Sequence, residues 1–324
     1  MDTAWYANTL GLGQIGGSNL TLVFALLLDA ALGEPKWLWK RLPHPAVLIG
    51  GVISKATSWL NHAPNQKSKG VILVILLVAS AYLLASALAQ LGFLVQIIAA
   101  AILIAQKSLV QHMSAVADSL RMSLEQGRNT VSMIVSRDTE QMNAPQVARA
   151  AIESGAENFS DGIVAPVFWF IIAGLPGLLV YKAVNTADSM IGYKTEEYLD
   201  FGWAAARLDD FANWIPARLA AIIIWLITGR AVRWQKISQD ASLHRSPNAG
   251  WPEAAMAYGI GVSLSGPRSY DGKMQNFPWV NANGDKYITS MDIERSVNTL
   301  WGAWCALLII VILISLTTYL PVWF

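Results

Sequence analysis

A run of 35 residues from Val71 to Ala105 is almost continuously apolar, and it limits what this chain can fold into. As one straight α-helix rising about 1.5 Å per residue, the run would exceed about 50 Å, whereas the hydrocarbon core of a membrane is about 30 Å thick. We therefore predict a helical hairpin that turns near Gln90 to Gly92. A single span that continues as a helix beyond the membrane is the alternative.

The composition extends this interpretation to the whole chain. Hydrophobic residues make up 54% of the 324 residues and charged residues only 14%, which is unusual for a soluble domain. We predict an all-α, polytopic integral membrane protein with four or more transmembrane helices, together with re-entrant or membrane-embedded helices. Residues 1–324 are expected to form one integrated domain. The other apolar runs are Leu20 to Leu32, Ile163 to Tyr181, Phe211 to Thr228 and Leu300 to Leu320.

Charge and cysteine content exclude several classes of protein. The net charge of +1 gives no reason to expect nucleic-acid binding. The single cysteine, Cys305, excludes an intramolecular disulfide and argues against a structural zinc site.

The distribution of basic residues predicts the orientation in the membrane. Lys and Arg are absent before Lys36 and after Arg295, so both termini are expected to face away from the cytoplasm, with an even number of crossings. Four crossings are supplied by Leu20 to Leu32, the two halves of the predicted hairpin, and Leu300 to Leu320. The sequence leaves open whether residues 163–181 and residues 211–228 cross the membrane or re-enter it. The membrane side of residues 182–210 is open for the same reason. The Pro and Gly content of residues 163–181 favours re-entry of that segment.

Residues 136–218 form an acidic block that holds 11 of the 22 acidic residues, between and through apolar runs. Carboxylates beside lipid are costly unless a function or a partner offsets the cost, so the block is predicted to be catalytic. A polar segment, residues 230–298, is predicted to be cytoplasmic, with a turn-rich loop from Asp271 to Asp285.

Two helices are predicted outside the apolar runs. Residues 107–128 carry apolar residues at three- and four-residue steps, which predicts one amphipathic helix. A second helix is predicted to start at the cap Asn143, with Pro145 in its first turn and Gln146 three residues after the cap, and to run to about Glu157.

Glu153 and Glu157 are four residues apart on this second helix and share a face, and Asp161 would extend the row if the helix persisted. A solvated helix face is one interpretation of the row. The other is a set of oxygen ligands for Mg²⁺, which binds through one or two carboxylates plus substrate phosphates. The predicted metal ligands are Glu153, Glu157, Asp161 and Asp188.

Several stretches resemble the CobD/CbiB family of cobalamin biosynthesis, and the resemblance covers most of the chain from Asp29 to Leu320. The longest are Ala150 to Asp161 (AAIESGAENFSD), Ala183 to Tyr193 (AVNTADSMIGY) and Phe201 to Arg218 (FGWAAARLDDFANWIPAR). Shorter ones are Asp29 to Pro35 (DAALGEP), His44-Pro45, Arg137 to Thr139, Gly162 to Pro166 and Ser246 to Glu253 (SPNAGWPE).

The resemblance implies adenosylcobinamide-phosphate synthase activity. Such an enzyme joins the amine of (R)-1-aminopropan-2-ol phosphate, or of threonine phosphate, to the f-propionate of adenosylcobyric acid, an adenosylated corrinoid, with hydrolysis of ATP. The family acts as a multi-pass protein of the bacterial inner membrane. Because ATP is cytoplasmic, the active site is expected on the cytoplasmic side, near membrane lipid and other late cobalamin-pathway membrane enzymes.

This chemistry assigns roles to polar residues of the chain. Activating a carboxylate through ATP requires Mg²⁺ to screen the phosphates, cations to hold them and a base for the amine. Arg pairs at helical spacing with Asp most often form plain salt bridges, so no single pair is diagnostic. The predicted catalytic residues are Glu157, Asn158, Asp161, Asp209 and Asp210. The predicted substrate- and phosphate-binding residues are His44, Arg137, Lys182, Asn185, Lys194, Arg207, Asn213, Arg218 and Asn248, and His244 is a further candidate base or ligand.

A different class of function remains as the alternative. An AmpE-like membrane sensor or a small-molecule transporter would use buried carboxylates at broken helices. Pro166 and Pro176, within an apolar run, are the features that favour it.

Overall fold

The structure is a computed structural model that describes residues 12–35, 39–230, 232–270 and 272–317. These residues are predominantly helical and include four short strands, which confirms the predicted all-α class. The chain divides into two compact units, each built from separate parts of the sequence. Unit 1 comprises the described residues within 12–105, 165–212 and 308–317, and unit 2 comprises those within 106–164 and 213–307.

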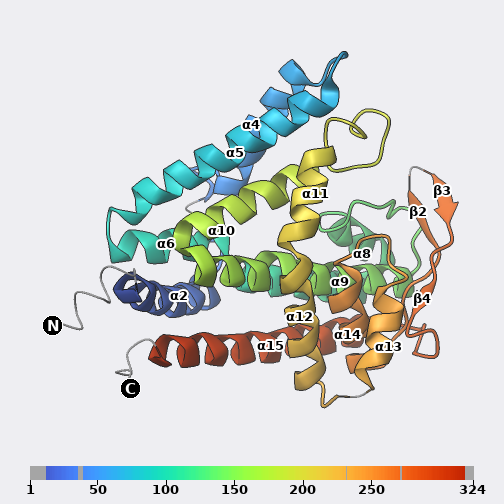
Figure 1. Cartoon of the computed structure of the whole chain (residues 1–324). Coiled ribbons are helices and arrows are strands. Elements are labelled where there is room, and N and C mark those ends of the chain that lie inside the picture. The colour runs from blue at the N-terminus through green and yellow to red at the C-terminus, as the bar shows by residue number, and fades with distance from the viewer. Residues whose placement is uncertain (1–11, 36–38, 231, 271, 318–324) are drawn as a thin grey trace. The chain divides into compact units, whose positions relative to one another are not determined.

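In unit 1, the helix α10 is the central element. It spans Ala165–Ile191 and packs against α2 (Leu12–Leu32), α4 (Pro45–Leu60), α5 (Gln66–Ala89), α6 (Phe93–Leu103) and α11 (Trp203–Ala212). Figure 1 shows α10 alongside α5. The backbone leaves helical geometry at Ala173 and at Gly174, where φ is 62°. The predicted Pro- and Gly-containing run is therefore helical but broken.

The turn predicted near Gln90 to Gly92, within the apolar run Val71 to Ala105, is confirmed. The helix α5 ends at Ala89 and α6 begins at Phe93, with Gly92 at a φ of 105° that favours glycine. At its other end, α5 packs closely on the 192–202 segment, because a Cβ on Gly70 would overlap the carbonyl oxygen of Phe201.

Unit 2 is organised around α9 (Ala144–Phe159), which continues as a π-helical turn, η1, at Ser160–Val164. The predicted cap is confirmed: Asn143 and Gln146 form a reciprocal capping box, and Pro145 lies in the first turn. The other helices are α7 (Gln106–Met122), α8 (Leu124–Val131), α12 (Trp214–Ile227), α13 (Trp234–Ala241), α14 (Gly250–Ile260) and the first part of α15 (Ser290–Thr317).

Two predictions in unit 2 were wrong in detail. The single helix over residues 107–128 is divided at Ser123, whose side chain caps α8 by accepting a hydrogen bond from the Gln126 amide. The turn-rich loop contains strands, because β2 (Arg268–Tyr270) and β3 (Lys273–Gln275) form an antiparallel hairpin around Gly272. The strands β1 (Leu264–Ser265) and β4 (Trp279–Val280) form a second antiparallel pair.

Within the residues that the structure describes, four helical stretches are long and apolar enough to cross a membrane, which confirms the polytopic prediction. A fifth is possible if α11 and α12, which meet the criterion only together, form one broken span. The apolar helix Asn19–Leu32 is shorter than the other candidates, and the last three residues of the predicted run Leu300 to Leu320 lie outside the described residues. The four stretches are Gln66–Gln90, Phe93–Met122, Ala144–Ile191 and Ser290–Thr317.

Candidate active site

Glu153, on α9 in unit 2, is a buried carboxylate held by two arginines. Its side chain is 1% exposed, and its Oε2 accepts hydrogen bonds from Arg137 Nη2 at 2.5 Å and Arg268 Nη1 at 3.2 Å. Its Oε1 accepts from the backbone N–H of Ser265 at 2.6 Å. Burying a carboxylate is tolerated when charge and hydrogen bonds are both satisfied, and Glu153 meets both conditions.

Aromatic rings support the arginines around Glu153. The guanidinium of Arg268 lies 5.0 Å from the ring of Phe277 and also donates to Ser265 Oγ at 2.7 Å. The guanidinium of Arg149 lies 4.7 Å from the ring of Trp279. These contacts fix the planes of the guanidinium groups, as bidentate recognition of an anion requires. Within the described part of the chain, the buried Nε of Arg268 makes no hydrogen bond.

The neighbouring predicted catalytic residues lie on the same helix and on the turn that follows it. Glu157 and Asn158 are exposed, and Arg137 and Arg245 are within electrostatic reach of the Glu157 carboxylate. The Asn158 amide donates to the Ser154 carbonyl oxygen at 2.9 Å. Asp161 lies in the π-helical turn η1, where the 3.6-residue repeat that aligns Glu153 with Glu157 is interrupted.

A second buried carboxyl in unit 2 lies on α14. Glu253 is 3% exposed, and its Oε1 lies 3.7 Å from Nε2 of His244, whose side chain is 11% exposed. Burial raises the pKa of Glu253 well above its usual value, and the negative charges of Glu153 and Glu157 add to this effect. Burial lowers the pKa of His244 to about 4. Burial therefore favours the neutral form of both side chains.

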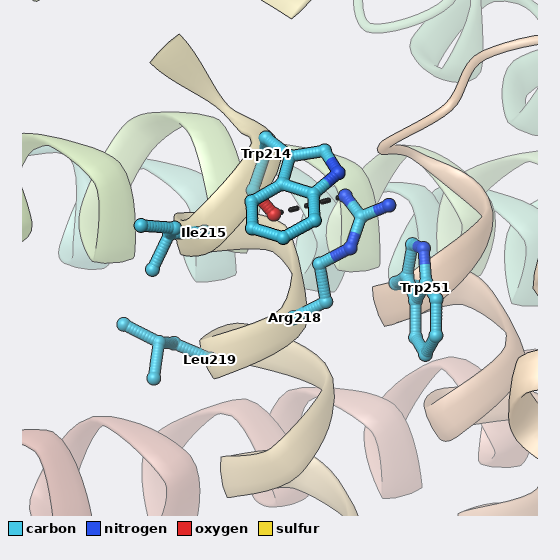
Figure 2. Close-up of a pocket in the computed structure, with 5 residues that line it drawn as sticks. All are labelled: Trp214, Ile215, Arg218, Leu219 and Trp251. Atoms are coloured by element: carbon cyan, nitrogen blue, oxygen red, sulfur yellow. Dashed lines mark hydrogen bonds between the residues drawn. The ribbon is translucent and has the colours of Figure 1, made fainter. Parts of the chain in front are cut away.

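Arg218 and Asn248, both predicted to bind substrate, contact one another. Arg218 Nη1 donates to Asn248 Oδ1 at 2.7 Å and to the Trp214 carbonyl oxygen at 2.9 Å, and Nη2 donates to the Pro247 carbonyl oxygen at 3.0 Å. Figure 2 shows the guanidinium between the side chains of Trp214 and Trp251, beside a cavity of about 360 Å³. Asn213, another predicted binding residue, is buried at the start of α12.

The predicted residues in unit 1 form two smaller groups. Asn185 Nδ2 donates to the buried Asp209 Oδ1 at 3.1 Å, so α10 and α11 are linked through a predicted binding and a predicted catalytic residue. The exposed Arg207 lies 3.8 Å from Asp210, which is the plain salt bridge that the spacing also allows. Asp188 lies against Gly192 at the end of α10, and Lys194 is exposed on the segment that follows.

The remaining two predicted binding residues, His44 and Lys182, line one cavity of about 240 Å³ in unit 1. His44 caps α4: its Nδ1 accepts a hydrogen bond from the Ala46 amide at 3.2 Å. Glu34 and Thr186 line the same cavity. Burial lowers the pKa of His44, so its imidazole is neutral at neutral pH.

The predicted Mg²⁺ ligands were compared with the donors that the structure brings together. No group of three or more His, Cys, Asp or Glu side chains that could hold a metal ion occurs within the ranges that the structure describes. Both carboxylate oxygens of Glu153 are engaged, with Arg137, Arg268 and the Ser265 amide, so Glu153 does not fit a magnesium ligand. Magnesium binding by the other three residues of the set, Glu157, Asp161 and Asp188, stays a prediction.

The sequence prediction missed the part of the Glu153 site that comes from distant residues. Arg268 and Ser265 are more than 100 positions away along the chain, at separations of 115 and 112. The only local signal was the turn-forming Gly266-Pro267 before Arg268. Glu253 ends the SPNAGWPE motif, but its burial was not predicted because the motif reads as a polar turn.

Comparison with known proteins gave consistent matches over most of the chain. The CobD/Cbib protein family matches residues 22–300. A relative from Rhizobium meliloti, described as cobalamin biosynthesis protein CobD, is 48% identical over 303 residues, which cover 88% of this chain and 93% of the relative. A relative of the same description from Brucella suis is 44% identical over 92% of this chain and 97% of its own length. No solved structure matches the chain.

Proposed function

Because the chain belongs to the CobD/CbiB family of cobalamin biosynthesis proteins, we propose that it is an ATP-dependent amide ligase, an adenosylcobinamide-phosphate synthase. Its substrates are adenosylcobyric acid, ATP and (R)-1-aminopropan-2-ol phosphate, or threonine phosphate in place of the latter. The carboxylate oxygen of the f-propionate takes the γ-phosphoryl group, and ADP leaves. The amine nitrogen then attacks the acyl carbon, the bond from carbon to the phosphate oxygen breaks, and inorganic phosphate leaves as the amide forms.

The arginines around Glu153 and Glu157 are the observation that supports this chemistry. Arg137, Arg149 and Arg268 act electrostatically on Glu153, and Arg245 joins Arg137 and Arg268 around Glu157. Guanidinium groups held by carboxylates and aromatic rings are pre-organised to bind phosphate oxygens in a bidentate manner. In this proposal, the arginines hold the transferring phosphoryl group.

The carboxylates take different roles in this proposal. Glu153 is fully hydrogen-bonded and holds the arginines in position. Glu157 is exposed one helical turn later and is free of the three hydrogen bonds that engage Glu153, so it is the better candidate for accepting the proton of the attacking amine. Magnesium, when bound with the nucleotide, would screen phosphate charge.

The proposal is tested with the full-length protein purified in detergent. Incubation with ATP, Mg²⁺, adenosylcobyric acid and aminopropanol phosphate is expected to yield adenosylcobinamide phosphate by mass spectrometry, with one ADP per amide. Arg268→Gln is expected to lower kcat about 100-fold, as loss of a pre-organised donor does. Arg233→Gln, which changes an exposed arginine in the same unit, is the matched control. Absence of product from validated substrates would reject the proposal.

Because ATP is cytoplasmic, the same proposal predicts that the acidic block, residues 136–218, faces the cytoplasm. The native Cys305 is exposed and is first replaced by Ser, and Glu196→Cys then places a single thiol in the 192–202 segment. A membrane-impermeant maleimide is expected to label this thiol in inverted vesicles and not in intact cells. Labelling from the outside only would place this segment, and with it the predicted residues nearby, on the wrong side for ATP.

One observation favours the second candidate function, a transporter or an AmpE-like sensor. The break in α10 at Ala173 and Gly174 resembles the discontinuous helices of transporters. Proteoliposomes that accumulate a corrinoid or an amino phosphate without forming an amide would support transport. Amide formation in detergent, where no compartment exists, would favour the ligase.

A further inference from the structure

The β2–β3 hairpin of unit 2 carries Arg268, one of the two arginines on the Glu153 carboxylate. Each strand of the hairpin has three residues, and all three residues of β3 are exposed. A two-stranded hairpin is only marginally stable by itself. The position of Arg268 therefore depends on the contacts that hold the hairpin to the rest of the unit.

Asp138, in the segment between α8 and α9, contacts the hairpin at its first strand and at its turn. Its Oδ2 accepts hydrogen bonds from Ser269 Oγ and from the backbone N–H of Gly272, each at 2.8 Å. The backbone N–H of Asp138 donates to the Ser269 carbonyl oxygen at 3.3 Å. Because hydrogen bonds to a carboxylate are stronger than those between neutral groups, Asp138 fixes the hairpin more strongly than a neutral acceptor would.

Each residue of the Asp138–Ser269 pair directly follows an arginine that contacts Glu153. Arg137 precedes Asp138 and Arg268 precedes Ser269. The two guanidinium groups donate to the same oxygen, Glu153 Oε2, at 2.5 and 3.2 Å. Two segments that are 131 residues apart in the sequence are thus joined one residue beyond each arginine. Because consecutive Cα atoms are only about 3.8 Å apart, a change in this contact would move the arginines relative to one another.

The guanidinium of Arg268 keeps one donor for a ligand. Its Nη1 donates to Glu153 and its Nη2 donates to Ser265 Oγ at 2.7 Å. Its Nε is buried and makes no hydrogen bond within the residues that the structure describes. A buried N–H without an acceptor is costly, and an oxygen of a bound ligand would offset the cost. This requires that the guanidinium stays in place.

We propose that Asp138 is a positioning residue for phosphoryl transfer. It holds the β2–β3 hairpin so that Arg137 and Arg268 share the Glu153 carboxylate, and so that the Nε–H of Arg268 remains available to a phosphoryl oxygen. Asp138 acts through these arginines and takes no part in bond formation. The inference rests on the proposed function, in which the arginines hold the transferring phosphoryl group.

The first experiment measures the hairpin without any substrate. Hydrogen–deuterium exchange of hairpin peptides is followed by mass spectrometry in the full-length protein in detergent. Asp138→Ala is expected to speed exchange about tenfold or more, because it removes hydrogen bonds to a charged acceptor. Asp138→Asn keeps an acceptor oxygen without the charge and is expected to lie between Asp138→Ala and wild type. Glu125→Ala, which changes an exposed acid of α8 in the same unit, is the matched control.

The second experiment asks whether Asp138 acts through Arg268. Asp138→Ala is expected to lower kcat for amide formation about tenfold or more, because small displacements of positioning groups are costly. In the Arg268→Gln background, the same change is expected to lower kcat less than about twofold. The thermal unfolding midpoint, which needs no substrate, is expected to show the same non-additivity. Ser269→Ala removes the hydroxyl donor from the other side of the contact and replaces Asp138→Ala if that variant does not fold.

The outcomes separate this inference from the proposed function. Wild-type exchange of the hairpin in Asp138→Ala would overturn the contact, whatever the activity. Faster exchange with equal effects of Asp138→Ala in both backgrounds would reduce Asp138 to a structural role and overturn positioning. Faster exchange with non-additive unfolding midpoints, in a protein that forms no amide, would support positioning of Arg268 by Asp138 and reject the ligase.

Discussion

Nε2 of His244 and Oε1 of Glu253 lie 3.7 Å apart, yet they do not form an ion pair at neutral pH. Burial lowers the pKa of His244 to about 4 and raises that of Glu253 well above its ordinary value of 4.5. The two shifts act on stability at opposite ends of the pH range. Because each group can be replaced by a neutral amide, their contributions can be measured separately.

His244 is expected to destabilise unit 2 on acidification. Its pKa is about 4 in the folded protein against 6.5 for an ordinary histidine, so the unfolded chain binds the extra proton between these values. The contribution is fully present above pH 6.5 and is lost as pH falls toward 4. At about 1.4 kcal/mol for each pKa unit, the loss is about 3 kcal/mol. Denaturant unfolding in detergent should show His244→Gln losing less stability than wild type from pH 7 to 4.

Glu253 is expected to act in the opposite direction. Its raised pKa means that the folded protein keeps a proton that the unfolded chain releases above pH 4.5. This contribution is present below that pH and is lost as pH rises toward the folded-state pKa. Glu253→Gln keeps a neutral side chain of the same shape and should therefore gain stability over wild type at pH 8 relative to pH 5. A parallel pH profile for variant and wild type would contradict a protonated Glu253.

Glu153→Gln is expected to be strongly destabilising. It removes the counter-charge of Arg137 and Arg268, whose side chains are only 11% and 10% exposed, and leaves both cations buried. Breaking one partner of a buried pair costs about 3–5 kcal/mol. The measurement is the midpoint of thermal unfolding in detergent.

Asp118→Asn is the control for Glu153→Gln. Asp118 pairs with Arg121 on the exposed surface of α7, where water screens the charges. A much smaller change in midpoint is expected. Equal changes in the two variants would indicate that burial of the Glu153 cluster contributes nothing.

Two glycines of neighbouring helices make a matched pair in unit 1. Gly70→Ala would place a Cβ against the carbonyl oxygen of Phe201, and overpacking of this kind costs about 1–3 kcal/mol. Gly51→Ala on α4 meets no atom within 4 Å, and replacing a helical glycine by alanine is expected to stabilise by about 0.5–1 kcal/mol. Thermal midpoints that shift in opposite directions would confirm the close contact of α5 with residue 201.

Local sequence rules were sufficient for much of the fold. Asn143 and Gln146 predicted a helix start because a capping box involves only residues three apart, and Gly92 predicted a turn because few other residues adopt its φ. The same rules missed the division at Ser123, where the apolar pattern continues across a helix cap. They also missed the β2–β3 hairpin, because its three-residue strands are too short to show alternation.

The candidate site was less predictable than the fold. The spacing of Glu153 and Glu157 correctly placed both on α9, but helical spacing cannot reveal which distant cation a carboxylate meets. Arg268 therefore went unassigned, and Glu153 was predicted to bind a metal ion. In contrast, His44 and Lys182 were predicted separately and line one cavity. Their proximity depends on the packing of α4 and α6 with α10, which no motif encodes.

The Glu153 cluster also constrains the order of events during synthesis. Arg137 precedes Glu153 by 16 residues, whereas Ser265 and Arg268 follow it by 112 and 115 residues. At roughly 5–20 residues per second, a ribosome needs on the order of 6–20 s to reach them. Throughout that interval Arg137 is the only one of the three hydrogen-bond partners of Glu153 that has been made, and Arg149 is the only other cation already present beside it. The nascent chain therefore depends on these two arginines to keep α9 compatible with an apolar environment until translation supplies Ser265 and Arg268.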